Sequence, residues 1–144
     1  MAATDADPCV FCKIISGEVG SRQVYADDDA IAFLDLAPFQ PGHALVVPRE
    51  HVASMLDGQQ TMARLGPAIE TTARLLVSRL DAQGINLLCS AGEVAGQEVF
   101  HLHVHLIPRY ADRPGLRRLF ESPKDAATEE ALDAVLARVR NDRR

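Results

Sequence analysis

The segment Phe100-His101-Leu102-His103-Val104-His105-Leu106-Ile107-Pro108 holds three of the five histidines in this chain. Alternate side chains of a β-strand share one face, so a strand over residues 99–108 places His101, His103 and His105 on the same side. The leucines and valine between them then point into the core. The sequence therefore predicts a row of imidazoles on one face of a strand.

Such a row of imidazoles suits metal binding or phosphate chemistry. The alternative is a polar strand face whose histidines only form hydrogen bonds. Imidazole nitrogen is a preferred zinc ligand, so one prediction is a three-histidine metal site. A neutral imidazole is also a nucleophile, and a neighbouring ring can donate a proton. The preceding loop, Gly92-Glu93-Val94-Ala95-Gly96-Gln97, offers backbone N–H groups that can bind an anion. The loop favours phosphate chemistry.

The remaining sequence predicts short strands around one long helix. Strands are expected at residues 23–27, 30–36, 44–48 and 85–89. Helical spacing of apolar residues predicts a helical turn at 9–16, a long helix over 58–80 that bends or restarts at Pro67, and a C-terminal helix over 128–140. We therefore expect the α+β class, with an antiparallel five-stranded sheet covered on one face by the long helix.

Length and composition exclude several classes of protein. The 144 residues, 47% of them hydrophobic, suit a single domain over 1–144, in which we expect 1–7 to be disordered. No apolar stretch approaches the ~20 residues of a membrane helix, and the net charge of -5 argues against DNA as a partner. The acidic start lacks the features of a secretory leader, and an odd number of cysteines suits a reducing compartment, so we expect a cytoplasmic protein.

Four blocks of the sequence together resemble the histidine triad family of nucleotide hydrolases and transferases. The loop and histidine run over 92–109 resemble the family signature, and Cys9-Val10-Phe11-Cys12-Lys13-Ile14-Ile15 resembles the opening of its nucleoside phosphoramidate hydrolase branch. Two further blocks match, Ala32-Phe33-Leu34-Asp35-Leu36-Ala37-Pro38 and Pro41-Gly42-His43-Ala44-Leu45-Val46-Val47-Pro48. The resemblance covers residues 9–110 and implies the fold of the histidine triad (HIT) family. Residues 111–144 then form a C-terminal extension that contains a helix.

The resemblance implies a role for each matching residue. His103 is the expected nucleophile, which attacks the α-phosphate and forms a nucleotidyl-histidine intermediate. His105 is expected to contact the phosphate and to help protonate the leaving group. His43 is expected to support both rings by hydrogen bonding. The expected nucleotide contacts are Asp35, Leu36, Ser90, Gly96, Gln97, Glu98, His103 and His105. Ser90 and Glu98 depart from the Asn and the Ser or Thr that the family often has, and a carboxylate at Glu98 repels phosphate.

The resemblance also bears on metal binding and assembly. From spacing alone, Cys9 and Cys12 are metal ligands, a redox pair or two buried thiols. Bacterial members of the family carry a structural zinc, for which the matching ligands here are Cys9, Cys12, His51 and His101. Family members form dimers, so the resemblance implies a homodimer. No organic cofactor is expected.

The expected reaction is hydrolysis of a purine nucleoside 5′-phosphoramidate or a related nucleotide. One alternative is a dinucleoside polyphosphate hydrolase or a nucleotidyl transferase, which shares the first step and differs in the leaving group or the acceptor. Another is a catalytically weak nucleotide-binding regulatory module, and a third is a structural zinc protein.

Overall fold

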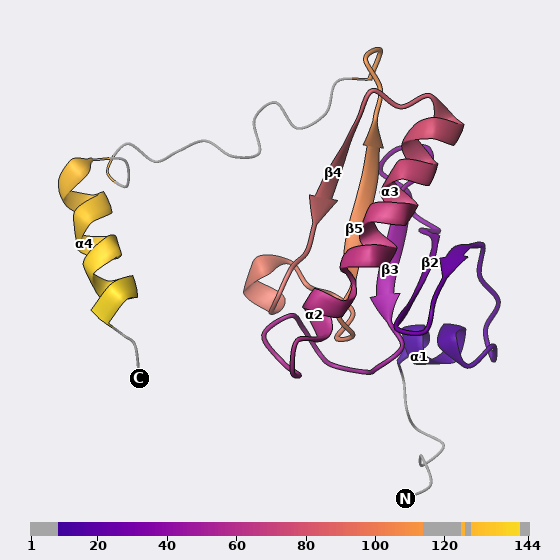
Figure 1. Ribbon diagram of the computed structural model, residues 1–144, viewed down its shortest axis with the longest axis horizontal. Coiled ribbons are helices and arrows are strands. Elements are labelled where there is room, and N and C mark those ends of the chain that lie inside the picture. The colour runs from indigo at the N-terminus through magenta and orange to yellow at the C-terminus, as the bar shows by residue number, and fades with distance from the viewer. Residues whose placement is uncertain (1–8, 114–124, 126–127, 142–144) are drawn as a thin grey trace, which may run out of the picture. The chain divides into compact units, whose positions relative to one another are not determined.

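Five antiparallel strands form one sheet in the order β1-β2-β3-β5-β4. The strands are β1 (Gln23–Ala26), β2 (Ala30–Leu34), β3 (Ala44–Pro48), β4 (Gly84–Leu88) and β5 (Val104–Arg109). The helices are α1 (Val10–Ile15), α2 (Thr61–Arg64), α3 (Gly66–Leu80), a 3-10 turn η1 (Glu93–Ala95) and α4 (Glu129–Asn141). The computed structural model thus confirms the predicted α+β class (Figure 1).

The structure describes residues 9–113, 125 and 128–141. These belong to two compact units, Met1–Arg113 and Pro114–Arg144. Residues 1–7, expected to be disordered, lie outside the described part, and the single domain over 1–144 stays a prediction. Within the described residues, no helix combines the length and apolar character that a membrane crossing requires.

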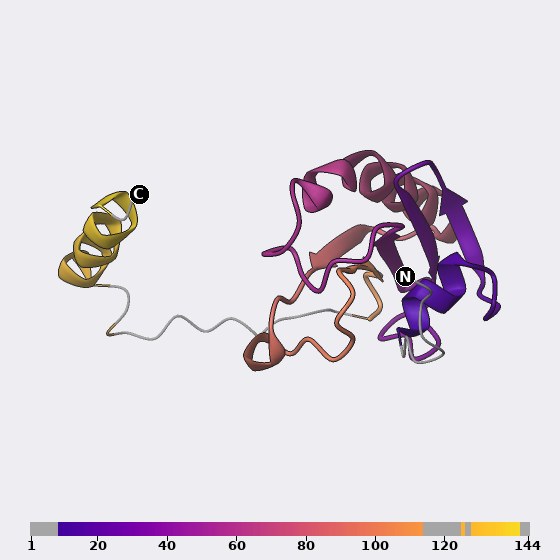
Figure 2. The same ribbon diagram turned by 90° about the horizontal axis from the view of Figure 1, so that it is seen from below.

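The sheet buries both of its faces, and the alternation of side chains along each strand decides which core each residue joins. On one face, Ala44 and Val46 of β3 pack with residues of α3 in the larger core. On the other, Leu45 and Val47 pack with Phe11 of α1 in a smaller core. Figure 2 shows α3 and α1 on opposite sides of the strands. His105 lies on the second face, because its neighbours Val104 and Leu106 belong to the core on the α3 side.

The predicted strand over 99–108 is wrong in its first half, because β5 begins only at Val104. Its ladder with β4 ends at the pair Leu88–His105, beyond which β4 has no residues to offer. The preceding segment pairs elsewhere, since the N–H of Leu102 donates to the carbonyl of Val52 at 2.8 Å. His101 and His103 therefore lie outside the strand, with freedom to turn to different neighbours.

The predicted helix over 58–80 is two helices, α2 and α3, which meet at Leu65. Pro67 stands in the first turn of α3, where a missing N–H costs no hydrogen bond. The restart at Pro67 is thus the alternative that the structure adopts. In the second unit, α4 confirms the predicted C-terminal helix, and the hydroxyl of Thr128 accepts a hydrogen bond from the N–H of Ala131 at 3.2 Å, as an N-cap does.

Candidate functional site

Strand pairing places one histidine next to an apolar surface of the sheet. His105 of β5 pairs with Leu45 of β3, and Leu45 pairs with Phe33 of β2. Directly paired residues on one face of a sheet have adjacent side chains. His105, Leu45 and Phe33 therefore form a row across three strands on the face that α1 covers.

Hydrogen bonds fix where the protons lie on His43 and His105. The backbone N–H of Phe39 donates to Nδ1 of His43 at 3.0 Å, so this nitrogen carries no hydrogen when the ring is neutral. The hydrogen of His43 must then lie on Nε2, which is 2.9 Å from Nδ1 of His105 and donates to it. His105 in turn carries its hydrogen on Nε2. The carboxylate of Asp35 lies 3.6 Å from Nε2 of His43.

His103 has the opposite proton arrangement from His105. Its Nδ1 lies 2.7 Å from the carbonyl oxygen of His101, which only accepts, so Nδ1 carries the hydrogen. The Nε2 of a neutral His103 therefore has a free lone pair. The rings of His103 and His105 are 5.0 Å apart between centroids. A ring with an unprotonated Nε2 and a ring with a protonated Nε2 thus stand side by side.

Lowered pKa values favour neutral rings of His43 and His105 in the free protein. Burial, followed by the neighbouring rings of His103 and His43, lowers the pKa of His105 to about 4, and the Asp35 carboxylate only partly opposes this. Burial is also the largest cause that lowers the pKa of His43. Ligand atoms of Asp35, His43 and His105 lie within 4.8 Å of one another, and in this group Nε2 of His43 is hydrogen-bonded to Nδ1 of His105.

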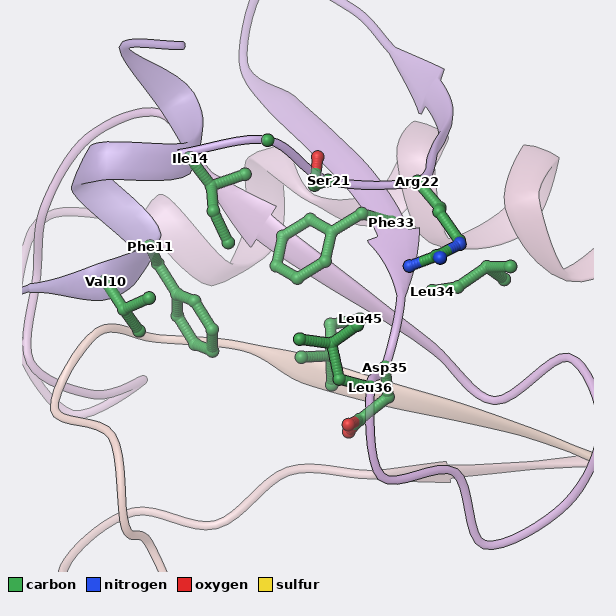
Figure 3. A pocket seen from close by; sticks show the side chains of 11 residues that line it. Val10, Phe11, Ile14, Ser21, Arg22, Phe33, Leu34, Asp35, Leu36 and Leu45 are labelled. Carbon is green, nitrogen blue, oxygen red and sulfur yellow. The ribbon is translucent and has the colours of Figure 1, made fainter. Parts of the chain in front are cut away.

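A largely apolar cavity of about 490 Å³ opens beside these histidines. It is lined by Val10, Phe11, Ile14, Gly20, Ser21, Arg22, Phe33, Leu34, Asp35, Leu36 and Leu45. Figure 3 shows the Phe11 and Phe33 rings near Leu45, with the Asp35 carboxylate beyond them. The ring of Phe11 also contacts that of His103 edge-on at 5.1 Å. The volume and lining are those of a small-ligand pocket with few polar groups.

The loop before the histidines is held by Gln97. This side chain is 3% exposed; its Oε1 accepts from the N–H of Gly92 at 2.8 Å, and its Nε2 donates to the carbonyls of Ala53 and Val99 at 2.6 and 3.0 Å. Gly92 and Gly96 both have φ of 94°, a conformation that other residues rarely adopt. The Gln97 side chain thus shapes the loop, and only its main chain remains for a ligand. Glu98 is exposed and Ser90 half-buried.

The four predicted metal ligands come together at a separate site. Nδ1 of His101 lies 3.4 Å from Sγ of Cys9 and 3.5 Å from Sγ of Cys12. Nδ1 of His51 lies 3.2 Å from Sγ of Cys12 and 3.1 Å from Nδ1 of His101. All four atoms lie within 4.8 Å of one another, which makes a possible metal site. Ligand separations in a tetrahedral zinc site are about 3.3–3.8 Å, so the cluster fits such an ion.

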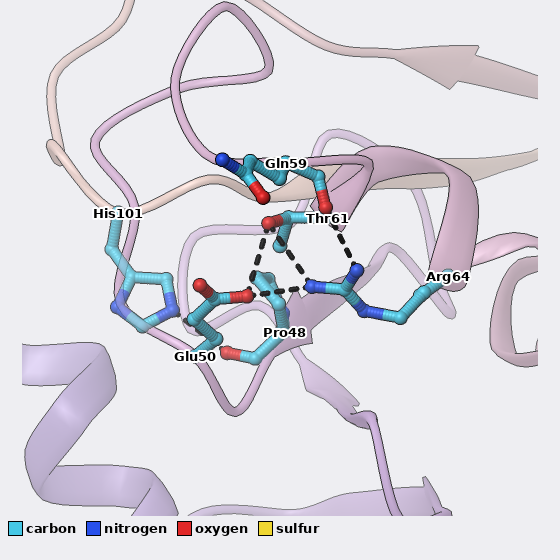
Figure 4. A network of polar contacts seen from close by, with 6 residues as sticks. All are labelled: Pro48, Glu50, Gln59, Thr61, Arg64 and His101. Atoms are coloured by element: carbon cyan, nitrogen blue, oxygen red, sulfur yellow. Dashed lines mark hydrogen bonds and ion pairs between the residues drawn. The ribbon is translucent and has the colours of Figure 1, made fainter.

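The surroundings of the cluster orient its ligands. Nε2 of the fully buried His101 donates to the carbonyl of Pro48 at 2.8 Å, which leaves Nδ1 unprotonated, as a metal ligand must be. Next to His51, the carboxylate of Glu50 accepts from the hydroxyl of Thr61 at 3.0 Å and from Arg64 at 2.7 Å (Figure 4). Both contacts tie the segment that carries His51 to α2.

The predicted site residues therefore fall into two groups. His43, His103, His105 and Asp35 come together, while His101 joins the cysteines and His51, so the three-histidine metal site is wrong. Sequence reasoning missed the contacts of Phe11 and Phe39 with the histidines, and the place of Arg22 in the cavity lining. Phe11 lies inside the block that opens the family resemblance, but no sequence signal pointed to Arg22 or Phe39.

Comparisons with known proteins assign the family. A HIT domain model matches residues 16–112. A HIT family protein from Bacillus anthracis has a solved structure with a TM-score of 0.85 and 34% identity, covering 96% of this chain and 99% of that one. A histidine triad nucleotide-binding protein from Candida albicans gives 0.80 and 28%, covering 93% and 96%. An adenylylsulfatase, HINT3 of Arabidopsis thaliana, is 34% identical over 109 residues, 75% of this chain and 55% of its own length.

The chain belongs to the HIT family, the histidine triad proteins. Members of this family bind nucleotides and are in general nucleotide hydrolases or transferases. The fold of these relatives is the α+β fold described above.

The lowered pKa of His105 predicts its titration. In the free protein, NMR of the imidazole nitrogens should show His105 neutral down to about pH 4, against an ordinary value of 6.5 in the urea-unfolded chain. Because the unfolded chain then takes up the proton more readily, this group should lower the free energy of unfolding as the pH falls from 6.5 towards 4. A His105 that titrates near 6.5 in the folded protein contradicts the described burial.

Proposed function

We propose that the protein hydrolyses purine nucleoside 5′-phosphoramidates or related nucleotides through a covalent intermediate on His103. The observation that carries this proposal is the opposite proton arrangement of two adjacent rings. His103 presents a free lone pair at Nε2, because its Nδ1 donates to the carbonyl of His101. His105 presents a hydrogen at Nε2, because its Nδ1 accepts from His43. A nucleophile and an acid are what the first step of such a reaction needs.

In the first step, Nε2 of His103 attacks the α-phosphorus and the phosphorus–nitrogen bond breaks. The negative phosphate raises the pKa of His105 on binding, so this ring takes up a proton from solvent at Nδ1 and enters the step as imidazolium. The Nε2–H of His43 then turns from His105 to the carboxylate of Asp35, 3.6 Å away. His105 passes its Nε2 proton to the leaving nitrogen. The products are a neutral amine and a nucleotidyl group on His103. The hydrogen bond from Nδ1 of His103 to the His101 carbonyl stabilises the positive charge that the attacking ring acquires.

In the second step, water attacks the same phosphorus. Neutral His105 now accepts the proton of the water, the bond to His103 breaks, and a nucleoside monophosphate leaves. Both rings return to their starting states, so protons and electrons balance over the cycle. His105 acts as acid and then as base from one position.

The cavity supports a nucleoside as the bound part of the substrate. The Phe11 and Phe33 rings line its wall and offer apolar surface for a planar base. The Asp35 carboxylate, which accepts one hydrogen bond from the N–H of Ala37 at 2.9 Å, retains acceptor capacity for ribose hydroxyls. The main chain at Gly96, Gln97 and Glu98, together with Ser90 and Leu36, completes the proposed contacts.

The leaving group distinguishes this proposal from its alternatives. A dinucleoside polyphosphate hydrolase or a nucleotidyl transferase shares the attack by His103, and the name of the Arabidopsis relative adds adenylyl sulfate to the candidate substrates. The exposed carboxylate of Glu98 in place of a hydroxyl disfavours leaving groups with further negative charge. We therefore favour an amine. A regulatory module that binds nucleotides without turnover remains the alternative from another class.

Removing the nucleophile tests the reaction. His103→Ala should lower the hydrolysis of adenosine 5′-phosphoramidate by at least about a thousandfold, in line with the loss of a covalent nucleophile. Release of AMP, measured by chromatography, is the readout, and Glu98→Ala serves as a folded variant that keeps all three histidines. Full activity of His103→Ala excludes the covalent mechanism, and AMP binding by wild type without any turnover favours the regulatory module.

We further propose that the cluster of Cys9, Cys12, His51 and His101 holds zinc as a structural ion. Four protein ligands leave no position for substrate, so the bound ion would cross-link α1 to the segment before β5. The backbone N–H of Cys12 donates to Sγ of Cys9 at 3.3 Å, a contact that suits a thiolate. Metal-held thiolates also suit the predicted cytoplasmic location.

Metal analysis tests this site directly. Wild type should contain one zinc ion per chain by mass spectrometry, and Cys12→Ser should lose most of it and unfold at a lower temperature. Cys89→Ser is the matched control, because Cys89 packs against the α3 core and lies outside the cluster. A stoichiometric zinc content in Cys12→Ser, or none in the wild type, would overturn the proposal.

We also propose that the protein is a homodimer. β4 is an edge strand of the sheet, and Leu87 and Leu88 on it are 53% and 39% exposed. An exposed apolar edge strand offers unpaired backbone groups to which another chain can pair. Sedimentation equilibrium should give twice the mass of 15.7 kDa, which an added charge through Leu87→Lys should reduce; a monomeric wild type contradicts the proposal.

A further inference from the structure

We propose that the ring of Phe39 is a platform for the leaving group, so that the protein prefers nucleoside phosphoramidates whose amine carries an aromatic ring. This inference rests on the proposed hydrolysis and names the leaving-group class that the same site selects. Phe39 lies in the segment between β2 and β3, and its side chain is 64% exposed. It is a large apolar side chain at the surface that contributes little to either core.

The position of Phe39 is fixed by the catalytic histidines. Its backbone N–H is bonded to Nδ1 of His43 at 3.0 Å, and its ring centroid is 4.8 Å from that of His43. The same ring lies 6.5 Å from that of His105 and is parallel to it within 9°. The backbone hydrogen bond therefore holds an exposed aromatic face beside the proton donor.

Two phenylalanines border the histidines at different ends. Phe11 contacts His103 and lines the cavity proposed for the nucleoside, whereas Phe39 contacts His43 and His105 and is outside the cavity lining. The nucleoside end of the substrate therefore occupies the side of Phe11. The ring of Phe39, at the other end, is therefore left for a different part of the substrate.

The chemistry of the transfer places the leaving group near Phe39. The attacking and leaving atoms stand in line on opposite sides of phosphorus, so the amine lies away from Nε2 of His103. Its nitrogen must also come within hydrogen-bond reach of His105, which delivers the proton. The substituent on that nitrogen consequently extends past His105, where the ring of Phe39 lies parallel to it.

An aromatic substituent gains most from this arrangement. Stacked aromatic pairs gain affinity beyond their buried area, which corresponds to roughly a threefold to tenfold advantage over a small alkyl group. A small amine reaches the same acid without touching the platform. The side chain of Phe39 thus selects the leaving group, while the backbone N–H of Phe39 positions His43.

Two matched substrates separate these roles. Adenosine 5′-phosphoramidates of 2-phenylethylamine and of ethylamine share the nucleotide and differ only in the phenyl ring. The ratio of their kcat/KM values should favour the phenyl substrate in wild type and fall about threefold to tenfold in Phe39→Ala. Phe39→Leu should retain part of the preference. Leu56→Ala, an 81% exposed side chain away from the histidine contacts, should leave the ratio unchanged.

Each outcome decides the proposal. Equal losses on both substrates in Phe39→Ala, with a shifted pH profile, show that Phe39 acts only through the histidines and overturn the platform. An unchanged ratio, or the same fall in Leu56→Ala, also overturns it while leaving the hydrolysis intact. If wild type turns over neither substrate, the proposed function fails, and the platform fails with it.

Discussion

The hydrogen bond from the Phe39 backbone to Nδ1 of His43 sets the chemistry of the whole site. Because a backbone N–H only donates, it assigns the proton of His43 to Nε2, and this proton then assigns that of His105. A carbonyl does the reverse for His103, whose Nδ1 must donate. Two main-chain groups thus give two adjacent, chemically identical side chains opposite proton arrangements, on which the proposed roles of nucleophile and acid rest.

The fold serves this arrangement by keeping both faces of the sheet buried. The α3 face holds the larger core, and the α1 face combines a smaller core with the cavity and the histidines. Burial on that face lowers the pKa of His105 to about 4, so the proposed mechanism relies on the negative phosphate of the substrate to charge this ring. The cluster of two cysteines and two histidines fastens α1 to the same region.

The sequence predicted the parts of the structure that depend on local pattern. The strand at Ala44–Pro48 and the C-terminal helix follow from apolar periodicity, and family blocks brought Asp35, His43 and His105 into one site. The strand through His101 was wrong because its extent depends on where β4 ends, which no local pattern reveals. Phe39 was missed for a similar reason: its contact with His43 arises from the path of a loop and leaves no periodic signal.

If His103 carries the nucleotide during turnover, the nucleotidyl-histidine species can be trapped and identified. The protein is mixed with adenosine 5′-phosphoramidate, quenched in alkali within milliseconds, digested and analysed by mass spectrometry. We predict an adenylyl group on His103 that forms and decays at rates compatible with turnover. Turnover without any adduct, or an adduct on another histidine, would contradict the assignment of protons from which the mechanism is built.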